Sequence, residues 1–214
     1  MTTPLSEPKR GCTLCPRLVS YRDENRKQQP DWHNAPVPSF GALDASLLVV
    51  GLAPGRMGAN RTGRPFTGDY AGKLLYGTLS KYGFASGTYG ERPDDGLALV
   101  GCRITNAVRC APPGNRPLPA EIKDCGRFLA SEVTAMPKLK GILALGQIAH
   151  NAVLDTFGLK RSAHKFGHGA QHDLGQGRLL VDSYHCSRLN TNTGRLTDAM
   201  FADVVAALKK HIGR

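Results

Sequence analysis

Four of the six cysteines follow a pattern typical of a metal centre. Cys12 and Cys15 form a C-x-x-C pair followed directly by Pro16, and Cys110 and Cys125 flank a proline-rich segment. The N-terminus has no apolar signal core, so we expect an intracellular protein, in which cysteines more often bind metal than form disulfides. Four thiolates suit either zinc or an iron–sulfur cluster, and spacing alone does not separate the two.

A glycine-rich segment that follows an apolar run forms the second candidate site. Glycines between a strand and a helix let backbone amides approach an anion, and Arg56, Arg61 and Arg64 would add positive charge. The segment matches neither a P-loop nor a dinucleotide-binding turn, which disfavours an NTPase or a dehydrogenase. Phe66 and Asp69 end the segment. Taken alone, Phe66 is also typical of a core aromatic, and Asp69 is better explained as a helix N-cap or a first-turn acid.

Two further residues have side chains suited to recognising or protonating a base. His185 lies in a segment rich in hydrogen-bond donors, and the pKa of an imidazole is easily moved around neutrality. Asn106 offers a donor and an acceptor together, which suits a base edge. The alternatives are a hydrogen-bonded structural histidine and a turn-forming asparagine.

The elements that must position these residues alternate between strand and helix. Apolar runs predict strands at 46–52, 97–108, 140–146 and 177–182. Helical spacing predicts helices from Lys73, over 119–135, over 147–157 and over 197–211. This alternation implies an α/β fold with a parallel sheet covered on both faces. Ligands of such folds bind beyond the carboxyl ends of the strands, where the candidate residues lie.

The length of the chain indicates the number of domains, and its charge indicates the kind of binding partner. The 214 residues predict a single domain: residues 1–45 form a mostly irregular arm, with a short helix after Pro16, and residues 46–214 form the α/β part, the two folding as one unit. Lys and Arg total 28 against 17 for Asp and Glu, and the net charge of +11 favours a polyanion, foremost nucleic acid. No apolar run is long enough to span a membrane. We expect a monomeric cytoplasmic protein that binds DNA and no membrane.

Taken jointly, the motifs resemble those of the iron–sulfur uracil-DNA glycosylases, and within them family 5 (type B). They run in order from the cysteine pair nearly to the C-terminus and comprise Cys12-Thr-Leu-Cys15-Pro-Arg-Leu, Gly51-Leu-Ala-Pro-Gly, Asn60-Arg-Thr-Gly-Arg-Pro-Phe-Thr-Gly-Asp69, Asn106-Ala-Val-Arg-Cys-Ala-Pro-Pro, Ala144-Leu-Gly, Ser162-Ala-His-Lys-Phe-Gly-His-Gly169 and Ser183-Tyr-His-Cys-Ser-Arg-Leu-Asn-Thr-Asn-Thr-Gly-Arg-Leu-Thr197. Many relatives have a proline where this chain has Cys186. As in family 5, the turn after the first strand contains no acidic residue. The resemblance therefore implies that Asp69 is the acidic residue of the site.

The resemblance implies a three-layer αβα fold around a four-stranded parallel sheet. It implies a [4Fe-4S] cluster on Cys12, Cys15, Cys110 and Cys125. It also implies a monofunctional DNA-repair hydrolase that removes uracil from single- or double-stranded DNA and leaves an abasic site. Hypoxanthine, xanthine and other deaminated bases are further expected substrates.

The same resemblance, together with the chemistry of base flipping, assigns roles to the candidate residues. Phe66 would stack on the extruded uracil and Asn106 would pair with its Watson–Crick edge. His185 would stabilise the departing anion, and Asp69 would stabilise the cationic sugar and activate water. The substrate would also contact the turn residues Gly51, Ala53 and Gly55.

DNA contacts are expected from two groups of residues. Arg56, Arg61 and Arg64 would hold phosphates, so that binding weakens with salt. The segment after His185 would enter the minor groove beside the vacated stack; it comprises Ser187, Arg188, Leu189 and Asn190.

Two alternative functions involve no catalytic turnover. One is an iron–sulfur or zinc module that only binds nucleic acid. The other is a trapping protein of the X type, which stays covalently attached to DNA through a histidine in an inserted basic loop. The segment between Cys110 and Cys125 contains no histidine, which disfavours trapping.

Overall fold

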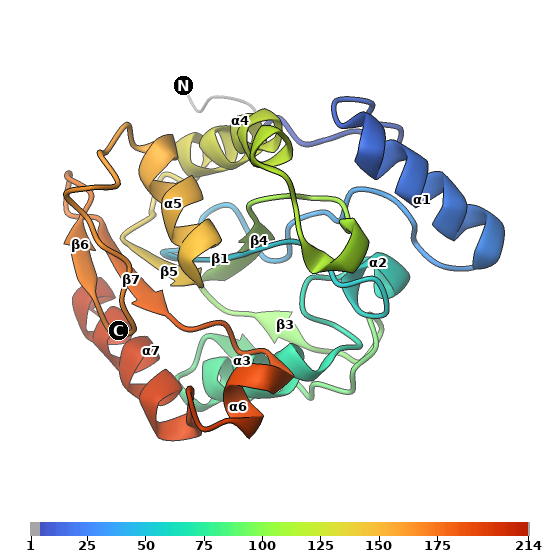
Figure 1. The fold of residues 1–214 in the computed structure, drawn as a ribbon. Coiled ribbons are helices and arrows are strands. Elements are labelled where there is room, and N and C mark those ends of the chain that lie inside the picture. The colour runs from blue at the N-terminus through green and yellow to red at the C-terminus, as the bar shows by residue number, and fades with distance from the viewer. Residues whose placement is uncertain (1–4, 214) are drawn as a thin grey trace.

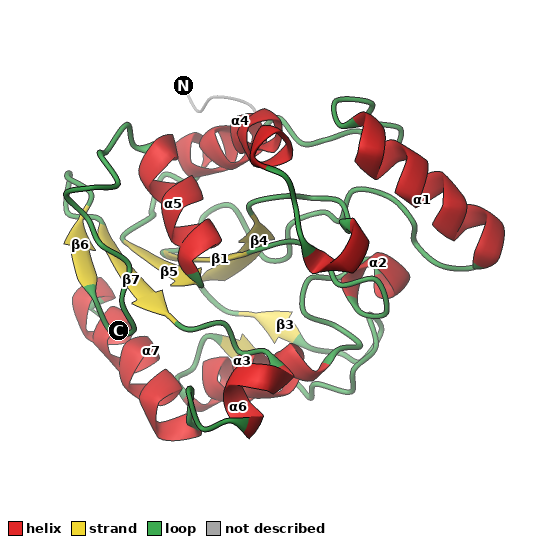
Figure 2. Ribbon diagram, in the orientation of Figure 1, coloured by secondary structure: helices red, strands yellow, loops and turns green. Residues whose placement is uncertain are grey.

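The computed structural model describes residues 5–213 as an α/β fold in three layers (Figure 1). The central sheet has the strand order β4-β1-β5-β7-β6. Its strands are β1 (Leu47–Gly51), β4 (Cys102–Asn106), β5 (Gly141–Leu145), β6 (Gln171–Asp173) and β7 (Leu179–Ser183). Figure 2 separates these strands from the helices, which are α1 (Pro16–Gln28), α2 (Ala59–Thr62), α3 (Tyr70–Lys81), α4 (Pro119–Ala135), α5 (Gln147–Thr156), α6 (Arg188–Asn192) and α7 (Asp198–Ile212), with a 3₁₀ turn at Pro113–Asn115.

The sheet has five strands, so the expectation of four is wrong by one edge strand. β4, β1, β5 and β7 are parallel to one another, which confirms the predicted parallel core. β6 joins the edge antiparallel to β7. Its three residues, Gln-His-Asp, carry no apolar pattern because an edge strand leaves much of its surface to solvent, so hydrophobic periodicity could not reveal it.

The central strands are apolar throughout because both faces of the sheet are buried. Leu47 and Val49 of β1 belong to a core shared with α3 and α7. Leu48 and Val50 point to the opposite face and pack in a second core with α4 and α5. Side chains therefore alternate between two helical layers, and Figure 1 shows the helices of these layers on the two sides of the sheet.

The predicted strand over 97–108 is interrupted at Gly101. This glycine has φ 61°, a region that favours glycine. The chain before it forms β3 (Ala98–Leu99), which pairs antiparallel with β2 (Ala85–Ser86) in a separate ribbon. Only the part from Cys102 onward, β4, enters the central sheet.

The N-terminal arm holds a regular helix, α1, which covers 13 residues and begins at Pro16. Proline suits the first position of a helix because its missing N–H would have no partner there. Leu18 of α1 packs with Val108, Cys125 and Phe128 in a small third core. The arm is thereby attached to α4 and to the segment after β4.

Side-chain caps set the ends of two long helices. Glu121 in the first turn of α4 accepts a hydrogen bond of 2.7 Å from the backbone N–H of Leu118. At α7 the hydroxyl of Thr197 accepts one of 3.2 Å from the backbone N–H of Met200. Within residues 5–213, no helix combines the length and the apolar character needed to cross a membrane.

Candidate active site

A cavity of about 500 Å³ opens beyond the carboxyl ends of β1, β4 and β7. Open α/β sheets bind their ligands at this edge. The predicted residues that line it are Ala53, Gly55, Arg56, Phe66, Asp69, Asn106, His185, Ser187 and Arg188. Residues from distant parts of the sequence thus surround one space.

Gly51 lies beneath the cavity rather than in its lining. It is the register partner of Asn106 at the ends of β1 and β4. A Cβ at residue 51 would overlap Asn106 Oδ1 and would stand 2.6 Å from Phe66 Cζ. Glycine is therefore required here so that the amide and the aromatic ring can approach the strand.

Phe66 adopts a backbone conformation that is rare for a bulky residue, with φ 52°. Its carbonyl accepts a hydrogen bond of 2.9 Å from the hydroxyl of Tyr89. The preceding carbonyl, that of Pro65, accepts one of 2.6 Å from Tyr76. Strain of this kind persists only where surrounding contacts enforce it, so these two tyrosines hold the ring at the cavity wall.

Asp69 stands at the N-cap of α3, as its alternative interpretation predicted, yet its side chain makes no capping hydrogen bond. Its Oδ1 is buried and has no hydrogen-bond partner within the described residues. Burial raises the pKa of this carboxyl, and the backbone amides of Gly72 and Ala71 oppose the rise. A Cβ at Gly58 would overlap the carboxylate, so this glycine leaves the space that Asp69 occupies.

Asn106 ends β4 with its side chain in the cavity wall. Its Oδ1 is the second buried side-chain oxygen at this cavity without a hydrogen-bond partner in the described part of the chain. An unpaired buried polar atom costs about 1–3 kcal/mol. Two such oxygens, on Asn106 and Asp69, indicate a site that a polar ligand completes.

His185 follows β7 and faces the ring of Phe66, with 6.0 Å between ring centroids. Burial lowers the pKa of His185 from 6.5 to about 4. The imidazole is therefore neutral at pH 7 and still offers one N–H donor. Its backbone carbonyl accepts a hydrogen bond of 2.8 Å from Asn190 Nδ2, which fixes the loop after β7.

Arg64 does not lie where the sequence led us to expect it. Its side chain is buried, forms an ion pair of 2.7 Å with Asp95 and donates to Thr67. The guanidinium also lies over the rings of Phe40 and Tyr76. The prediction that Arg64 contacts a DNA phosphate is therefore wrong. This arginine stabilises the glycine-rich loop from the interior, where Asp95 supplies its counter-charge.

The other three arginines predicted to bind DNA are partly or fully exposed. Arg56 lines the cavity, lies over the ring of Trp32 and donates to Asn25 and Gln28. Arg61 is exposed at the end of α2. A separate cation stands across the cavity, where exposed Arg188 lies over the ring of Tyr70.

The segment after His185 forms the short helix α6. Ser187 caps it by accepting a hydrogen bond from the backbone N–H of Asn190. The Asn190 side chain donates to the His185 carbonyl, so the side chains of both Ser187 and Asn190 are engaged within the loop itself. Leu189 differs, because 72 % of it is exposed, the highest value among the large exposed hydrophobic residues of the described chain.

Several lining residues were not singled out from the sequence. Met57 and Tyr70 are exposed hydrophobic residues at the cavity, with 55 % and 41 % exposure. Asn115, in the proline-rich segment, has φ 56° and also lines it. Met57 and Tyr70 could have been predicted, because each is a hydrophobic residue next to a charged residue of the glycine-rich loop. Nothing in the local sequence indicates Asn115.

All four cysteines of the predicted metal centre line one second cavity, beside α1. They come from the start of the chain, from the segment after β4 and from α4, and none forms a disulfide. The backbone N–H of Arg109 donates to Cys125 Sγ at 3.3 Å, and the surroundings are apolar, with Leu18, Val108 and Phe128. Four thiols with a backbone donor in an apolar site fit a thiolate-bound metal centre.

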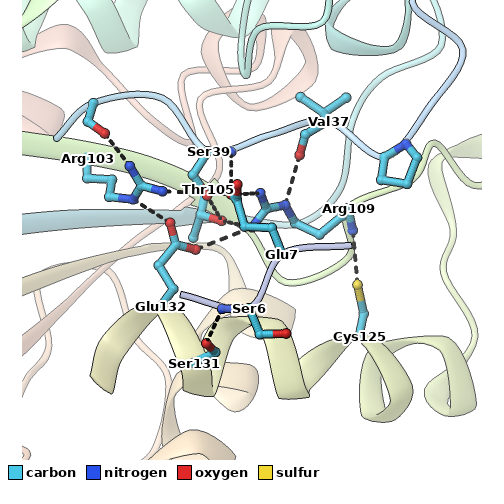
Figure 3. A network of polar contacts seen from close by, with 12 residues as sticks. Ser6, Glu7, Val37, Ser39, Arg103, Thr105, Arg109, Cys125, Ser131 and Glu132 are labelled. Atoms are coloured by element: carbon cyan, nitrogen blue, oxygen red, sulfur yellow. Dashed lines mark hydrogen bonds and ion pairs between the residues drawn. The ribbon is translucent and has the colours of Figure 1, made fainter. Parts of the chain in front are cut away.

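A buried ionic network supports the loop that carries Cys110 (Figure 3). The carboxylate of Glu132 on α4 binds Arg103 at 2.6 Å and Arg109 at 3.3 Å. Glu7 of the arm binds Arg109 at 3.0 Å. The network thus joins the arm, β4 and α4, and Arg109 links it to Cys125.

Comparison with known proteins places the chain in one family. Residues 38–209 match the model of the uracil DNA glycosylase superfamily. A Type-5 uracil-DNA glycosylase of Thermus thermophilus is 49% identical over 95% of this chain and 94% of its own length. One of Pyrobaculum aerophilum is 41% identical over 91% of this chain and 86% of its own length. A Type-4 uracil-DNA glycosylase of that organism is 34% identical over 76% and 68%.

The match covers the sheet, the cavity at its strand ends and the segments that carry Asp69, Asn106 and His185. The resemblance seen in the sequence motifs is thereby confirmed at the level of the family. This chain belongs to the uracil DNA glycosylase superfamily.

Proposed function

We propose that this protein hydrolyses the N-glycosidic bond of uracil in DNA and leaves an abasic site. The observation that carries the proposal is the pair of buried, unpartnered oxygens, Asp69 Oδ1 and Asn106 Oδ1, beside one cavity. One is an acid that can act on water and the other an amide that can read a base edge. The names of the relatives support the same activity.

Asn106 would recognise the flipped base. Uracil presents an N3–H beside O4, so the free Oδ1 can accept from N3 while Nδ2 donates to O4. Cytosine carries an unprotonated N3 and an amino group at these positions, and the amide would have to reverse to match them. Hypoxanthine and xanthine share the N–H and carbonyl pair of uracil, and the cavity of about 500 Å³ is large enough for a purine.

Phe66 and the turn after β1 would hold the base in place. The ring of Phe66 offers a face for stacking, which is worth about 1–3 kcal/mol per base. Ala53 and Gly55 line the same cavity and leave room for the sugar and its phosphate. Extrusion of the base costs a few kcal/mol, and these contacts offset that cost.

Bond cleavage moves an electron pair from C1′–N1 into the base. Negative charge then develops on O2 of uracil, and the neutral His185 would donate its N–H to that oxygen. The sugar becomes positively charged, and the carboxylate of Asp69 would stabilise it. Asp69 would then take a proton from water as the water oxygen bonds to C1′.

DNA would be held by cations and opened by one apolar side chain. Arg56, Arg61 and Arg188 are available for phosphates, and the net charge of +11 adds a long-range attraction. Leu189 is exposed on α6 beside the cavity and would fill the gap that the extruded base leaves. Because Ser187 and Asn190 are engaged within the loop, they would hold Leu189 rather than grip DNA.

The second cavity would hold a [4Fe-4S] cluster on Cys12, Cys15, Cys110 and Cys125. When bound, the cluster supplies a four-point covalent link between parts of the chain, with no part in cleaving the bond. The chain's own residues do the rest: the ion pair of Glu7 with Arg109 and the packing of Leu18 attach the arm to the α/β part. We infer that residues 1–45 and 46–214 fold as one unit.

The test is single-turnover excision from oligonucleotides that contain uracil, hypoxanthine or xanthine, single- or double-stranded, with alkaline cleavage to reveal abasic sites. Scission at the uracil position is expected with the wild type. Asp69→Asn should lower the rate about 10²–10⁴-fold with little change in DNA affinity.

Each other outcome contradicts the proposal in its own way. A salt-sensitive complex without excision would make the protein a binding module. A heat-stable protein–DNA adduct would indicate covalent trapping. An unchanged rate in Asp69→Asn would remove this carboxylate from the reaction.

A further inference from the structure

Away from the active site, two histidines and one aspartate from three different elements meet in the interior. They are His150 of α5, His172 of β6 and Asp182 of β7. One possible ligand atom of each lies within 4.8 Å of those of the others. The Asp182 carboxylate is 2.8 Å from His150 Nδ1 through Oδ1 and 3.1 Å from His172 Nε2 through Oδ2.

Both ring nitrogens of His150 face oxygen atoms that accept hydrogen bonds. Nε2 is 2.9 Å from the backbone carbonyl of His164, and Nδ1 is 2.8 Å from Asp182 Oδ1. A neutral imidazole carries only one N–H. If that proton lies on Nε2 and binds the carbonyl, the lone pair of Nδ1 points toward a carboxylate oxygen, and these two electron-rich atoms need a cation or a second proton to stabilise their approach.

We propose that His150, His172 and Asp182 bind a divalent transition-metal ion of the zinc class. Two imidazole nitrogens and a carboxylate are a donor set that zinc takes readily, and a fourth position is left for water. Ligands on one such ion are about 3.3 Å apart when bonds are about 2.0–2.1 Å, so the atoms found here at 2.8 and 3.1 Å would move slightly apart on binding. The ion would take the lone pair of Nδ1 and a carboxylate oxygen as ligands once these atoms move slightly apart.

The surroundings already have the outer contacts that metal ligands need. A metal-bound histidine usually donates its other N–H to a carbonyl or carboxylate, and the His164 carbonyl fills that role for His150. The backbone N–H of Gly167 lies 3.4 Å from Asp182 Oδ2 and orients the carboxylate. The side chains of His150 and Asp182 are 1% and 0% exposed, whereas that of His172 is 10% exposed and marks the route of entry.

The ion would stabilise the loop beside the active site. Asp182 also binds the 167–170 segment through its backbone, with its N–H on the Ala170 carbonyl and its carbonyl on the Gly169 N–H. Three residues later the chain reaches His185. A metal at Asp182 would thus lock β7, β6 and α5 together at the base of the segment that carries His185, and its role is structural.

The experiment uses the full chain with its cysteine-bound metal retained. The protein is dialysed against a mild chelator, its iron content is recorded, and zinc sulfate is added in a calorimeter. Wild type is compared with His172→Asn and with His211→Asn, which alters an exposed histidine on α7 as a control for surface imidazole binding. We expect about one zinc per chain in the wild type and the control, and binding weakened about 100-fold or more in His172→Asn.

X-ray absorption at the zinc edge, on the loaded wild type, tests the ligands without relying on any variant. Nitrogen and oxygen neighbours at about 2.0–2.1 Å are expected, whereas a sulfur neighbour at about 2.3 Å would place the zinc on the cysteines and overturn the proposal. Folded wild type that binds no zinc would also overturn it. Equal zinc affinity in His172→Asn and wild type would also overturn the proposal. The three residues would then form only hydrogen-bonded imidazole–carboxylate pairs.

Discussion

Gly51 and Asn106 are register partners at the ends of two neighbouring strands, and the Asn106 amide stands directly over the residue that has no side chain. The same glycine lies against the ring of Phe66. Two residues proposed to hold the base therefore depend on one missing methyl group. The dependence concerns position more than stability, because the atoms in the way are the ends of two side chains and not backbone.

Gly51→Ala should lower excision about 100-fold with little loss of folding, because the new methyl displaces the Asn106 amide and the Phe66 ring from the cavity. The measurement is the single-turnover rate on uracil DNA together with the melting temperature. Gly77→Ala is the control, since a Cβ at this position in α3 meets nothing within 4 Å. Equal rates in the two variants would contradict the dependence on Gly51.

The pH profile of excision should lack the inflection near 6.5 that an ordinary histidine produces. Burial lowers the pKa of His185 to about 4, so the imidazole stays neutral as the pH falls through 6.5. Burial raises the pKa of Asp69, so this carboxylate gains its proton at a higher pH than an exposed aspartate would. The rate should therefore fall only on the acidic side, as Asp69 becomes protonated.

That profile is checked with single-turnover rates measured under saturating enzyme, and DNA binding recorded at each pH separates affinity from chemistry. A fall in rate near pH 6.5 that persists in Asp69→Asn at constant affinity would show that His185 titrates normally. It would remove the argument for a neutral donor.

Leu189→Ala should impair excision from duplex DNA more than from single strands. A leucine buried in the vacated stack contributes about 1.5–3 kcal/mol, which only a duplex can provide. We expect a loss of about tenfold or more on the duplex substrate. Leu118→Ala, at an exposed leucine in the proline-rich segment, is the matched control, and an equal loss on both substrates would argue against a wedge.

Glu132→Ala should lower the free energy of unfolding by about 3–5 kcal/mol, because it leaves Arg103 and Arg109 buried without their shared carboxylate. Urea unfolding of the full chain measures the loss. Glu24→Ala, at an exposed position of α1, should change it by no more than about 0.5 kcal/mol. A similar small effect in Glu132→Ala would show that Glu7 alone balances both arginines.

Much of the architecture follows from local pattern. Apolar runs bounded by glycine and proline predicted β1, β4, β5 and β7, and the start at Pro119 predicted α4. Local pattern did not predict two features of the sheet, because the residues concerned carry no apolar periodicity or no visible break. Edge strand β6 is polar and three residues long, and Gly101 divides what appears in the sequence as one continuous strand.

For the site, the sequence by itself determined the residue types and the edge of the sheet to which they belong. Asn106 ends one strand, His185 follows another and Asp69 follows the loop after a third, and parallel strands bring those ends together. The clustering of the four cysteines also agrees with their spacing. These conclusions need only the order of elements along the chain.

Tertiary structure alone decided which polar groups face the ligand and which face one another. Arg64 and Arg61 are equivalent in the sequence, but Asp95, distant along the chain, draws Arg64 into the interior. His150, His172 and Asp182 share no motif, yet three elements bring them into contact. Burial and partners arise from packing between remote segments, and a single sequence records the groups without their distances.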